Sequence, residues 1–368
     1  MKTLTEPVGG KAVDQRRRLV LAVPLLGLAA SQAWAGGGPG APSGGGASEL
    51  LQSSRLLMGT RVDMSVSLHS ASIGRADAEL AMDAAFARMQ RLEALLSRFR
   101  GDSDIARIGE AAGRSPVRVS QQTMVLLEHA KAMHRHSGGA FDITIGALSR
   151  GWSFEPGHQQ APGKAEISQA LSLVNMRQLE LDPLAGTAWL RQGGMALDLG
   201  GIAKLPILQA GLNSLRDAGV SNALINGGGD VLISGANRGQ PWRIGIRDPN
   251  APQQLLGAIE LQGRGVVASS GDYERAFMRD GKLLHHVLDP KSGWPTQGVH
   301  GVALVAEQVE AVNGWGTALM VGGQGSLSSF ARRHPDVAVM AGISDGSHWY
   351  AGDMKQRLKP LAATRRAA

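Results

Sequence analysis

Residues 198–204 read Asp-Leu-Gly-Gly-Ile-Ala-Lys. The apolar run at 196–199 predicts a short buried strand, and the spacing of apolar residues over 203–218 predicts a helix directly after it. Glycines at a helix N-terminus let backbone N–H groups approach an anion, and Lys204 adds a positive charge there. The stretch therefore indicates either an anion-binding site or a plain glycine turn followed by a surface lysine.

Strand and helix patterns alternate through the rest of the chain. Period-two runs predict strands, and apolar residues three to four positions apart predict helices. We expect strands at 60–68, 223–225, 231–233, 242–246, 265–269 and 302–305, and helices at 76–97, at 121–136 and from 313 onward. This alternation predicts an α+β fold in which mixed sheets pack against helices. The order of the strands does not follow from it.

The composition narrows the class of protein. The chain has 368 residues, of which 43% are hydrophobic and 19% are charged, which excludes a wholly disordered chain and a polytopic membrane protein. It contains no cysteine. Disulfides, thiolate nucleophiles, cysteine-ligated zinc and a cysteine-linked lipid anchor are therefore excluded.

The N-terminus has the layout of a secretory signal peptide. A basic segment at 15–19 precedes an apolar run at 19–30, and Ala33-Trp34-Ala35 provides a cleavage pattern. The run is shorter than the roughly 20 residues that span a bilayer. Arg16-Arg17 resembles a twin-arginine signal, although Asp-Gln stands where that motif usually has Ser or Thr, so the general export route stays open. We expect a periplasmic protein with no membrane span after cleavage.

Four parts are expected along the chain. They are a cleaved signal peptide at 1–35, a Gly/Pro/Ser linker at 36–49, a folded domain at 50–358 and a basic tail at 359–368. Cleavage removes five basic and two acidic residues, so the net charge falls from +7 to +4. A charge this small on a chain of this length predicts no nucleic-acid partner.

Three further polar clusters could bind a ligand. Residues 226–230 read Asn-Gly-Gly-Gly-Asp and join two predicted strands, unlike a dinucleotide-binding fingerprint, which opens a helix. Asp142 stands between a glycine turn and a predicted β-branched strand, as a turn residue or a ligand contact. Asn313 and Thr317 are four residues apart, so a helix would place both oxygens on one face. Such oxygens suit a hard cation such as Mg²⁺, or ordinary surface polarity.

The Asp280-Gly281 pair predicts a hairpin turn, and two histidines follow it. Adjacent residues of a strand point to opposite faces, so we expect at most one of His285 and His286 to face a site. One histidine near Asp289 suits proton transfer or contact with a phosphate. The remaining histidines have no companions at metal-ligand spacing, so no zinc site is predicted.

In this order, the clusters resemble the ApbE family of FAD:protein FMN transferases. The resemblance runs from Met58-Gly59-Thr60 to Thr317 and includes 96–108, 138–148, 198–204, 226–230 and 269–293. The family implies a Mg²⁺-dependent enzyme that splits the diphosphate of FAD, joins FMN through a phosphoester to Thr or Ser of another protein and releases AMP. The implied acceptor is a flavoprotein of a membrane redox complex, of the Nqr, Rnf or nitrous-oxide-respiration type.

The resemblance also implies site residues, position by position. Met58 and Phe99 would flank the flavin, with Phe99 where the family often has Tyr. The other implied FAD contacts are Ala140, Phe141, Asp142, Asp198 and Lys204. Mg²⁺ would take the backbone carbonyl of Gly201 and the side-chain oxygens of Asn313 and Thr317. His286 matches the family's motif histidine and would be catalytic, near the reacting phosphates.

Two positions depart from the family pattern. Asn313 replaces an Asp and removes a negative charge, which predicts weaker Mg²⁺ binding. Leu205-Pro206 replaces Gly-Tyr. Pro206 is acceptable in a first helical turn, whereas Leu205 should crowd anything that approaches the backbone. The departures leave two alternatives to an active transferase: an FAD-binding protein with reduced or no transfer activity, such as a flavin carrier, and an FAD pyrophosphatase that uses water.

Overall fold

A computed structural model describes residues 49–69 and 71–361. The expected signal peptide and nearly all of the expected linker lie outside these residues, so both stay predictions. The described residues all belong to one compact unit, Ala33–Ala368. Its elements run from a strand at Leu50 to a helix that ends at Arg357. Lys359, expected in the tail, pairs its backbone with Ala258 and so belongs to the folded body.

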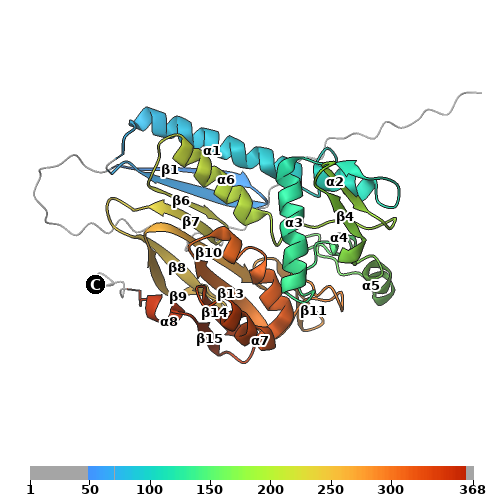
Figure 1. The fold of residues 1–368 in the computed structure, drawn as a ribbon. Helices are drawn as coiled ribbons and strands as arrows, with labels where there is room; N and C mark the ends of the chain where they lie inside the picture. Colours follow the sequence, from blue (N-terminus) through green and yellow to red (C-terminus); the bar gives the residue numbers. More distant parts are fainter. Residues whose placement is uncertain (1–48, 70, 362–368) are drawn as a thin grey trace, which may run out of the picture. The chain divides into compact units, whose positions relative to one another are not determined.

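An eight-stranded antiparallel sheet forms the centre of this unit (Figure 1). Hairpin neighbours pair side by side, and the strand order is β1-β2-β6-β7-β10-β13-β14-β15. Their bounds are β1 Leu50–Leu57, β2 Thr60–Ser67, β6 Ala223–Gly227, β7 Asp230–Gly235, β10 Gly263–Gly271, β13 Val299–Ala306, β14 Ala338–Ile343 and β15 His348–Ala351. Every neighbouring pair is antiparallel, so turns between strands lie at the sheet's ends.

Helices cover one face of the sheet. α1 (Arg75–Leu96) and α6 (Lys204–Asp217) lie side by side over the β1–β7 half, and α7 (Trp315–Arg333) packs on β10 and β13 (Figure 1). α1 approaches α6 closely because Gly211 leaves room for the Met89 side chain. The apolar faces of these helices and strands share one continuous core.

A second layer covers part of the other face. β8 (Trp242–Asp248) and β9 (Ala251–Leu261) pair with each other, and α8 (Met354–Arg357) packs beside them. Their apolar side chains form a separate core with alternate residues of the central strands, such as Val231, Ile233 and Val305. The central strands are therefore apolar on both faces, as continuous runs such as 231–233 and 302–305 reflect.

A smaller lobe inserts between α1 and α6 in the sequence. It contains α2 (Asp104–Glu110), α3 (Gln121–His136), α4 (Gly146–Ser149), α5 (Lys164–Leu171), the 3₁₀ helix η1 (Met176–Gln178) and the sheet of β3 (Val117–Arg118), β4 (Leu179–Asp182) and β5 (Thr187–Leu190). The hairpin of β11 (Ala276–Arg279) and β12 (Lys282–His285) shares an apolar cluster with α4 and α5. A second 3₁₀ helix, η2 (Val309–Ala311), precedes α7.

These elements confirm the α+β class predicted from the sequence. Three local expectations were wrong. The apolar residues Ala196, Leu197 and Leu199 are buried, but 196–199 form only one bridge, between Ala196 and Ile145. No strand follows Asp142. α7 begins at Trp315, so Asn313 lies before the helix. Gly314 separates them with a left-handed backbone (φ 85°), which turns the chain just ahead of α7.

We predict that Leu304→Ala lowers the free energy of unfolding by about 2–5 kcal/mol. Leu304 is fully buried in β13, at the centre of the sheet, so truncation removes apolar contacts and leaves a cavity. Leu184→Ala is the matched control, because that side chain is fully exposed in the turn before β5. Urea denaturation of both variants measures the difference, and equal stability would contradict this description of the core.

Candidate functional site

The turn between β1 and β2 brings Met58 to one end of the sheet. Leu57 pairs with Thr60, and both intervening residues, Met58 (φ 53°) and Gly59 (φ 66°), have left-handed backbones, as a two-residue hairpin turn requires. The Met58 N–H donates to the Glu93 carboxylate on α1 at 2.7 Å. That bond holds a non-glycine residue in an unusual conformation, which is typical of ligand sites.

The glycine turn between β6 and β7 lies against the first turn. A Cβ on Gly228 would lie 2.6 Å from the Thr60 hydroxyl oxygen, so only glycine fits there. The Asn226 side chain accepts the Gly229 N–H at 3.0 Å and fixes the turn. Asp230, which follows, accepts the Ser269 N–H with one oxygen at 2.9 Å and lies 3.1 Å from Lys204 Nζ with the other. The predicted anion-site lysine is thus tied to the glycine turn.

The carboxylate of Asp198 organises the loop before α6. One oxygen accepts the Gly200 N–H at 2.9 Å, and the other accepts the Ser149 hydroxyl at 2.8 Å. Arg98 Nε lies 3.4 Å from the same oxygen, and the Arg98 guanidinium stacks 4.5 Å from the centre of the Phe99 ring. The Phe99 side chain is otherwise 82% exposed. This network links the loop to the residue expected beside the flavin.

The carboxylate of Asp142 is buried and accepts hydrogen bonds from its neighbours. Its carboxylate accepts the Thr144 N–H at 2.8 Å and the Thr144 hydroxyl at 2.5 Å. His134 Nδ1 lies 3.3 Å from its other oxygen and donates to the Phe141 carbonyl at 3.0 Å. Burial raises the pKa of the Asp142 carboxyl group, against the opposing effect of the Thr144 donors and His134. The neighbouring Asp198 N–H binds the Ile143 carbonyl, which joins this cluster to the loop before α6.

Gly201 and Thr317 bring two helix N-termini together. A Cβ on Gly201 would lie 2.7 Å from the Thr317 hydroxyl oxygen and 3.1 Å from the Phe141 ring. Gly201 precedes α6 and Thr317 lies in the first turn of α7, and neither helix has a side-chain cap in the described structure. The uncapped N–H groups and the positive ends of both helix dipoles favour an anion.

Asn313 is 3% exposed, and its side chain makes no hydrogen bond within residues 49–69 and 71–361. The Thr317 hydroxyl has no hydrogen-bond partner there either. Gly314, next to Asn313, faces Ile202 in the loop before α6. The segment from Asn313 to Thr317 thus lies against the Gly201 loop, although not through the helical spacing that the sequence suggested. Two side-chain oxygens and a backbone segment remain free to hold a cation.

His285 and His286 differ as expected for adjacent residues at a strand end. His285 is buried, and its Nε2 donates to the Thr296 carbonyl at 2.9 Å. The side chain of His286 keeps exposed surface. The backbone N–H of His286 donates to the Arg275 carbonyl at 3.1 Å. Desolvation by the protein around it, with the positive charges of Arg275 and Lys204 and the adjacent His285 ring, lowers the pKa of His286 to about 4. Its ring is therefore neutral at pH 7 and can accept a proton.

Two groups of predicted residues thus gather around the loop before α6. Lys204, His286 and Met58 share the end of the sheet with both glycine turns, while Gly201 lies close to both Phe141 and Thr317. Ala140 directly precedes Phe141, and Phe99 reaches this region through Arg98, which pairs with Asp198. Leu205 packs into the core, so it does not crowd the site face.

Sequence reasoning missed Asp230, Arg275, Arg98 and Ser149 as members of the site. Asp230 and Arg275 stand inside motifs that were recognised, and Arg98 precedes Phe99. The partners of Asp230, Arg98 and Ser149 lie 26 to 100 residues away along the chain, so no local pattern pointed to these contacts.

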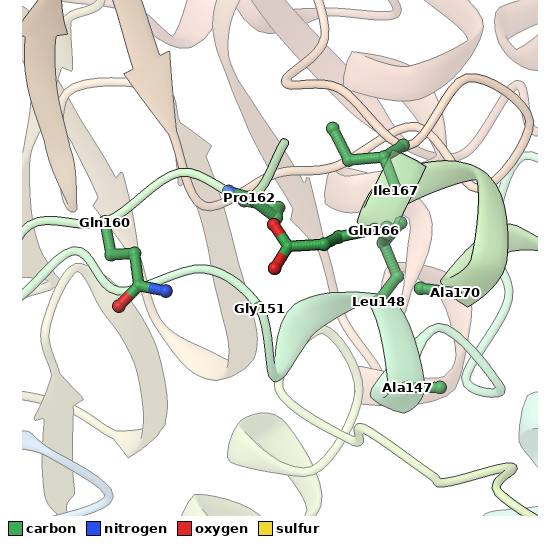
Figure 2. A pocket seen from close by; sticks show the side chains of 8 residues that line it. All are labelled: Ala147, Leu148, Gly151, Gln160, Pro162, Glu166, Ile167 and Ala170. Atoms are coloured by element: carbon green, nitrogen blue, oxygen red, sulfur yellow. The ribbon is translucent and has the colours of Figure 1, made fainter. Parts of the chain in front are cut away.

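Two cavities lie outside this region. The one in Figure 2 has a volume of about 170 Å³, lies between α4 and α5, and has Glu166 and Gln160 at its polar side. A second, of about 320 Å³, lies between α1, α3 and α6 and includes Pro206. None of the predicted site residues lines either one. The first is smaller than the 300–1,000 Å³ typical of ligand pockets.

No three side chains of His, Asp or Glu gather at a possible metal site anywhere in residues 49–69 and 71–361. A cation there would need amide, hydroxyl or backbone oxygens. The helices of the same residues include none that could cross a membrane.

The sequence profile of the ApbE family matches residues 58–341. The chain belongs to the ApbE family. This confirms the resemblance drawn from the motifs, and the matched range includes every predicted site residue from Met58 to Thr317.

Two ApbE relatives with the name FAD:protein FMN transferase match well. That of Klebsiella pneumoniae is 40% identical over 57% of this chain, and the match spans 65% of the relative's length. That of Treponema pallidum is 31% identical over 71% of this chain and 76% of its own.

Solved ApbE structures have the same fold. The ApbE protein of Thermotoga maritima is 28% identical with a TM-score of 0.76, covering 84% of this chain and all of its own. The flavin transferase ApbE of Vibrio cholerae is 25% identical with a TM-score of 0.73, covering 85% of this chain and all of its own.

We predict that the His286 ring titrates near pH 4 and is neutral at pH 5.5. Histidine side-chain NMR measures this directly, and His286→Gln identifies the signal by its loss. The physical reason is that desolvation by neighbouring protein groups and the positive charges of Arg275 and Lys204 disfavour the charged ring. A midpoint near the ordinary value of about 6.5 would contradict the described surroundings of His286.

Proposed function

We propose that this ApbE protein is a Mg²⁺-dependent FAD:protein FMN transferase. It attaches FMN through a phosphoester to Thr or Ser of an acceptor flavoprotein and releases AMP. The observation that carries the proposal is a neutral His286 at the same end of the sheet as two glycine turns and the N-terminal residue of α6. Family membership and the names of the relatives support the choice of FAD as substrate.

The proposed reaction is a phosphoryl transfer. The acceptor hydroxyl oxygen attacks the FMN phosphorus of FAD, a new P–O bond forms, and the bond from that phosphorus to the bridging oxygen breaks. AMP leaves with that oxygen, and the hydroxyl proton passes to the neutral His286 ring. Uncapped N–H groups of α6 and α7 offset the charge of the diphosphate.

The residues present fit a Mg²⁺ ion. Gly201, Asn313 and Thr317 supply only oxygen donors, which hard cations prefer, and the buried Asn313 amide has no other partner. Bound there, Mg²⁺ would neutralise charge on the phosphates. The protein's own part is to hold these oxygens in place, through the close contact of Gly201 with Thr317 and the left-handed turn at Gly314.

The acceptor and the compartment extend the same proposal. The signal-peptide pattern supports export to the periplasm, and the resemblance supports a flavoprotein of a membrane redox complex as acceptor, of the Nqr, Rnf or nitrous-oxide-respiration type. Such an acceptor would present its Thr or Ser hydroxyl on the side of His286 that keeps exposed surface.

One observation favours a second candidate. Asn313 provides no negative charge, so Mg²⁺ binding loses a charge–charge attraction and transfer could be slow or absent. The protein would then bind FAD without transferring FMN. A pyrophosphatase differs in that water, rather than a protein hydroxyl, attacks the phosphorus.

A transfer assay tests the proposal. The protein without its predicted signal peptide is incubated with FAD, Mg²⁺ and an acceptor domain. We expect the acceptor to gain the mass of one FMN group. The gain should vanish with EDTA and with the acceptor Thr changed to Val, and His286→Ala should slow it about 100-fold or more. Intact mass and in-gel flavin fluorescence measure it.

Controls separate the three candidates. FAD turnover without any acceptor would indicate the pyrophosphatase. Tight FAD binding without transfer, while a relative with Asp at the position of Asn313 modifies the same acceptor, would reject the transferase in favour of the binding protein.

We predict that Asn313→Asp lowers the half-saturating Mg²⁺ concentration by roughly ten-fold, since it adds a negative charge beside the cation. Calorimetric Mg²⁺ binding provides a readout independent of activity. Asn213→Asp on α6 makes the same chemical change away from the predicted Mg²⁺ ligands and is the matched control. No change at Asn313 relative to this control would discard the metal assignment.

A further inference from the structure

The Arg275 guanidinium is a positive charge at the site that the proposed mechanism does not use. Arg275 lies between β10 and β11, in the loop that follows Asp272. Its backbone carbonyl accepts the His286 N–H at 3.1 Å. Its side chain reaches back over the β1–β2 turn, where Nη2 lies 3.4 Å from the position of a Cβ on Gly59. Arg275 therefore connects the motif histidine to the Met58-Gly59 turn.

Two other cations near the site are paired. Lys204 is bound to Asp230, and Arg98 is bound to Asp198. Next along the loop, Glu274 pairs with Arg247, 3.3 Å away. Within residues 49–69 and 71–361, the Arg275 side chain makes neither an ion pair nor a hydrogen bond, and it is exposed.

The unpaired guanidinium of Arg275 affects the charge state of His286. Its charge disfavours protonation of His286, and no carboxylate of the described residues pairs with it. A bound anion would compensate the charge of Arg275, because a guanidinium can bind two phosphate oxygens at once through its planar fork. Because Asp230 already pairs with Lys204, the unpaired Arg275 is an additional positive charge available to the dianionic diphosphate of FAD.

We propose that Arg275 binds the diphosphate of FAD and fixes it between the Met58-Gly59 turn and His286. This rests on the proposed function for the identity of the ligand. Arg275 would contact phosphate oxygens directly and would hold the FMN phosphorus next to the neutral histidine ring.

The test compares Arg275→Met, Arg275→Lys and Arg279→Met. Arg279 ends β11, four residues further along the chain, and pairs with Asp280 and the Ala161 carbonyl, so it is the matched control. We expect Arg275→Met to weaken FAD binding roughly 10- to 100-fold and to leave riboflavin, which has the same ring system without phosphate, unaffected. Arg275→Lys keeps the charge but loses the fork, so it should lie between. Flavin fluorescence quenching measures all affinities.

A second readout separates this role from a structural one. In the protein without ligand, Arg275→Met should move the His286 titration midpoint upward, and Arg275→Lys should restore it. Unchanged FAD affinity, an equal loss in Arg279→Met, or an unmoved midpoint would each overturn the inference. If the unmodified protein transfers no FMN while Arg275→Met still loses FAD affinity, the proposed function fails and the role of Arg275 stands.

Discussion

Close approach of glycine backbone to neighbouring side chains is the constraint on which this site depends. Gly228 meets the Thr60 hydroxyl and Gly201 meets the Thr317 hydroxyl at distances that leave no space for a Cβ. These close contacts place two strand turns and two helix N-termini beside one another at one end of an antiparallel sheet. Backbone N–H groups, which cannot change their charge, then supply much of the attraction for an anion.

The charged side chains at the site include two ion pairs. Asp230 holds Lys204, and Asp198 holds Arg98 beside Phe99, so each cation has a fixed position before any ligand arrives. Fixed positions lower the entropy that binding must otherwise lose. Desolvation and the positive charges of Arg275 and Lys204 leave His286 uncharged next to groups that would bind phosphate.

Local sequence patterns predicted part of the fold and of the candidate site. The helix α3 was found residue for residue because Ser120 caps its start and a glycine turn follows its end. Residues 196–199 read as a strand because buried coil and buried strand share the same apolar signature. The spacing of Asn313 and Thr317 suggested one helix face, yet the left-handed Gly314 intervenes. The pairing of Lys204 with Asp230 is a tertiary contact, which no local pattern encodes.

The parts of the site come from residues as distant as Met58 and Thr317, so most of the domain must fold before the site exists. Contacts between such distant segments form late and slowly, because each closes a long loop. A ligand of the completed site therefore binds the native state and not the unfolded one. By mass action, the concentration of that ligand would then contribute to the lifetime of the folded protein.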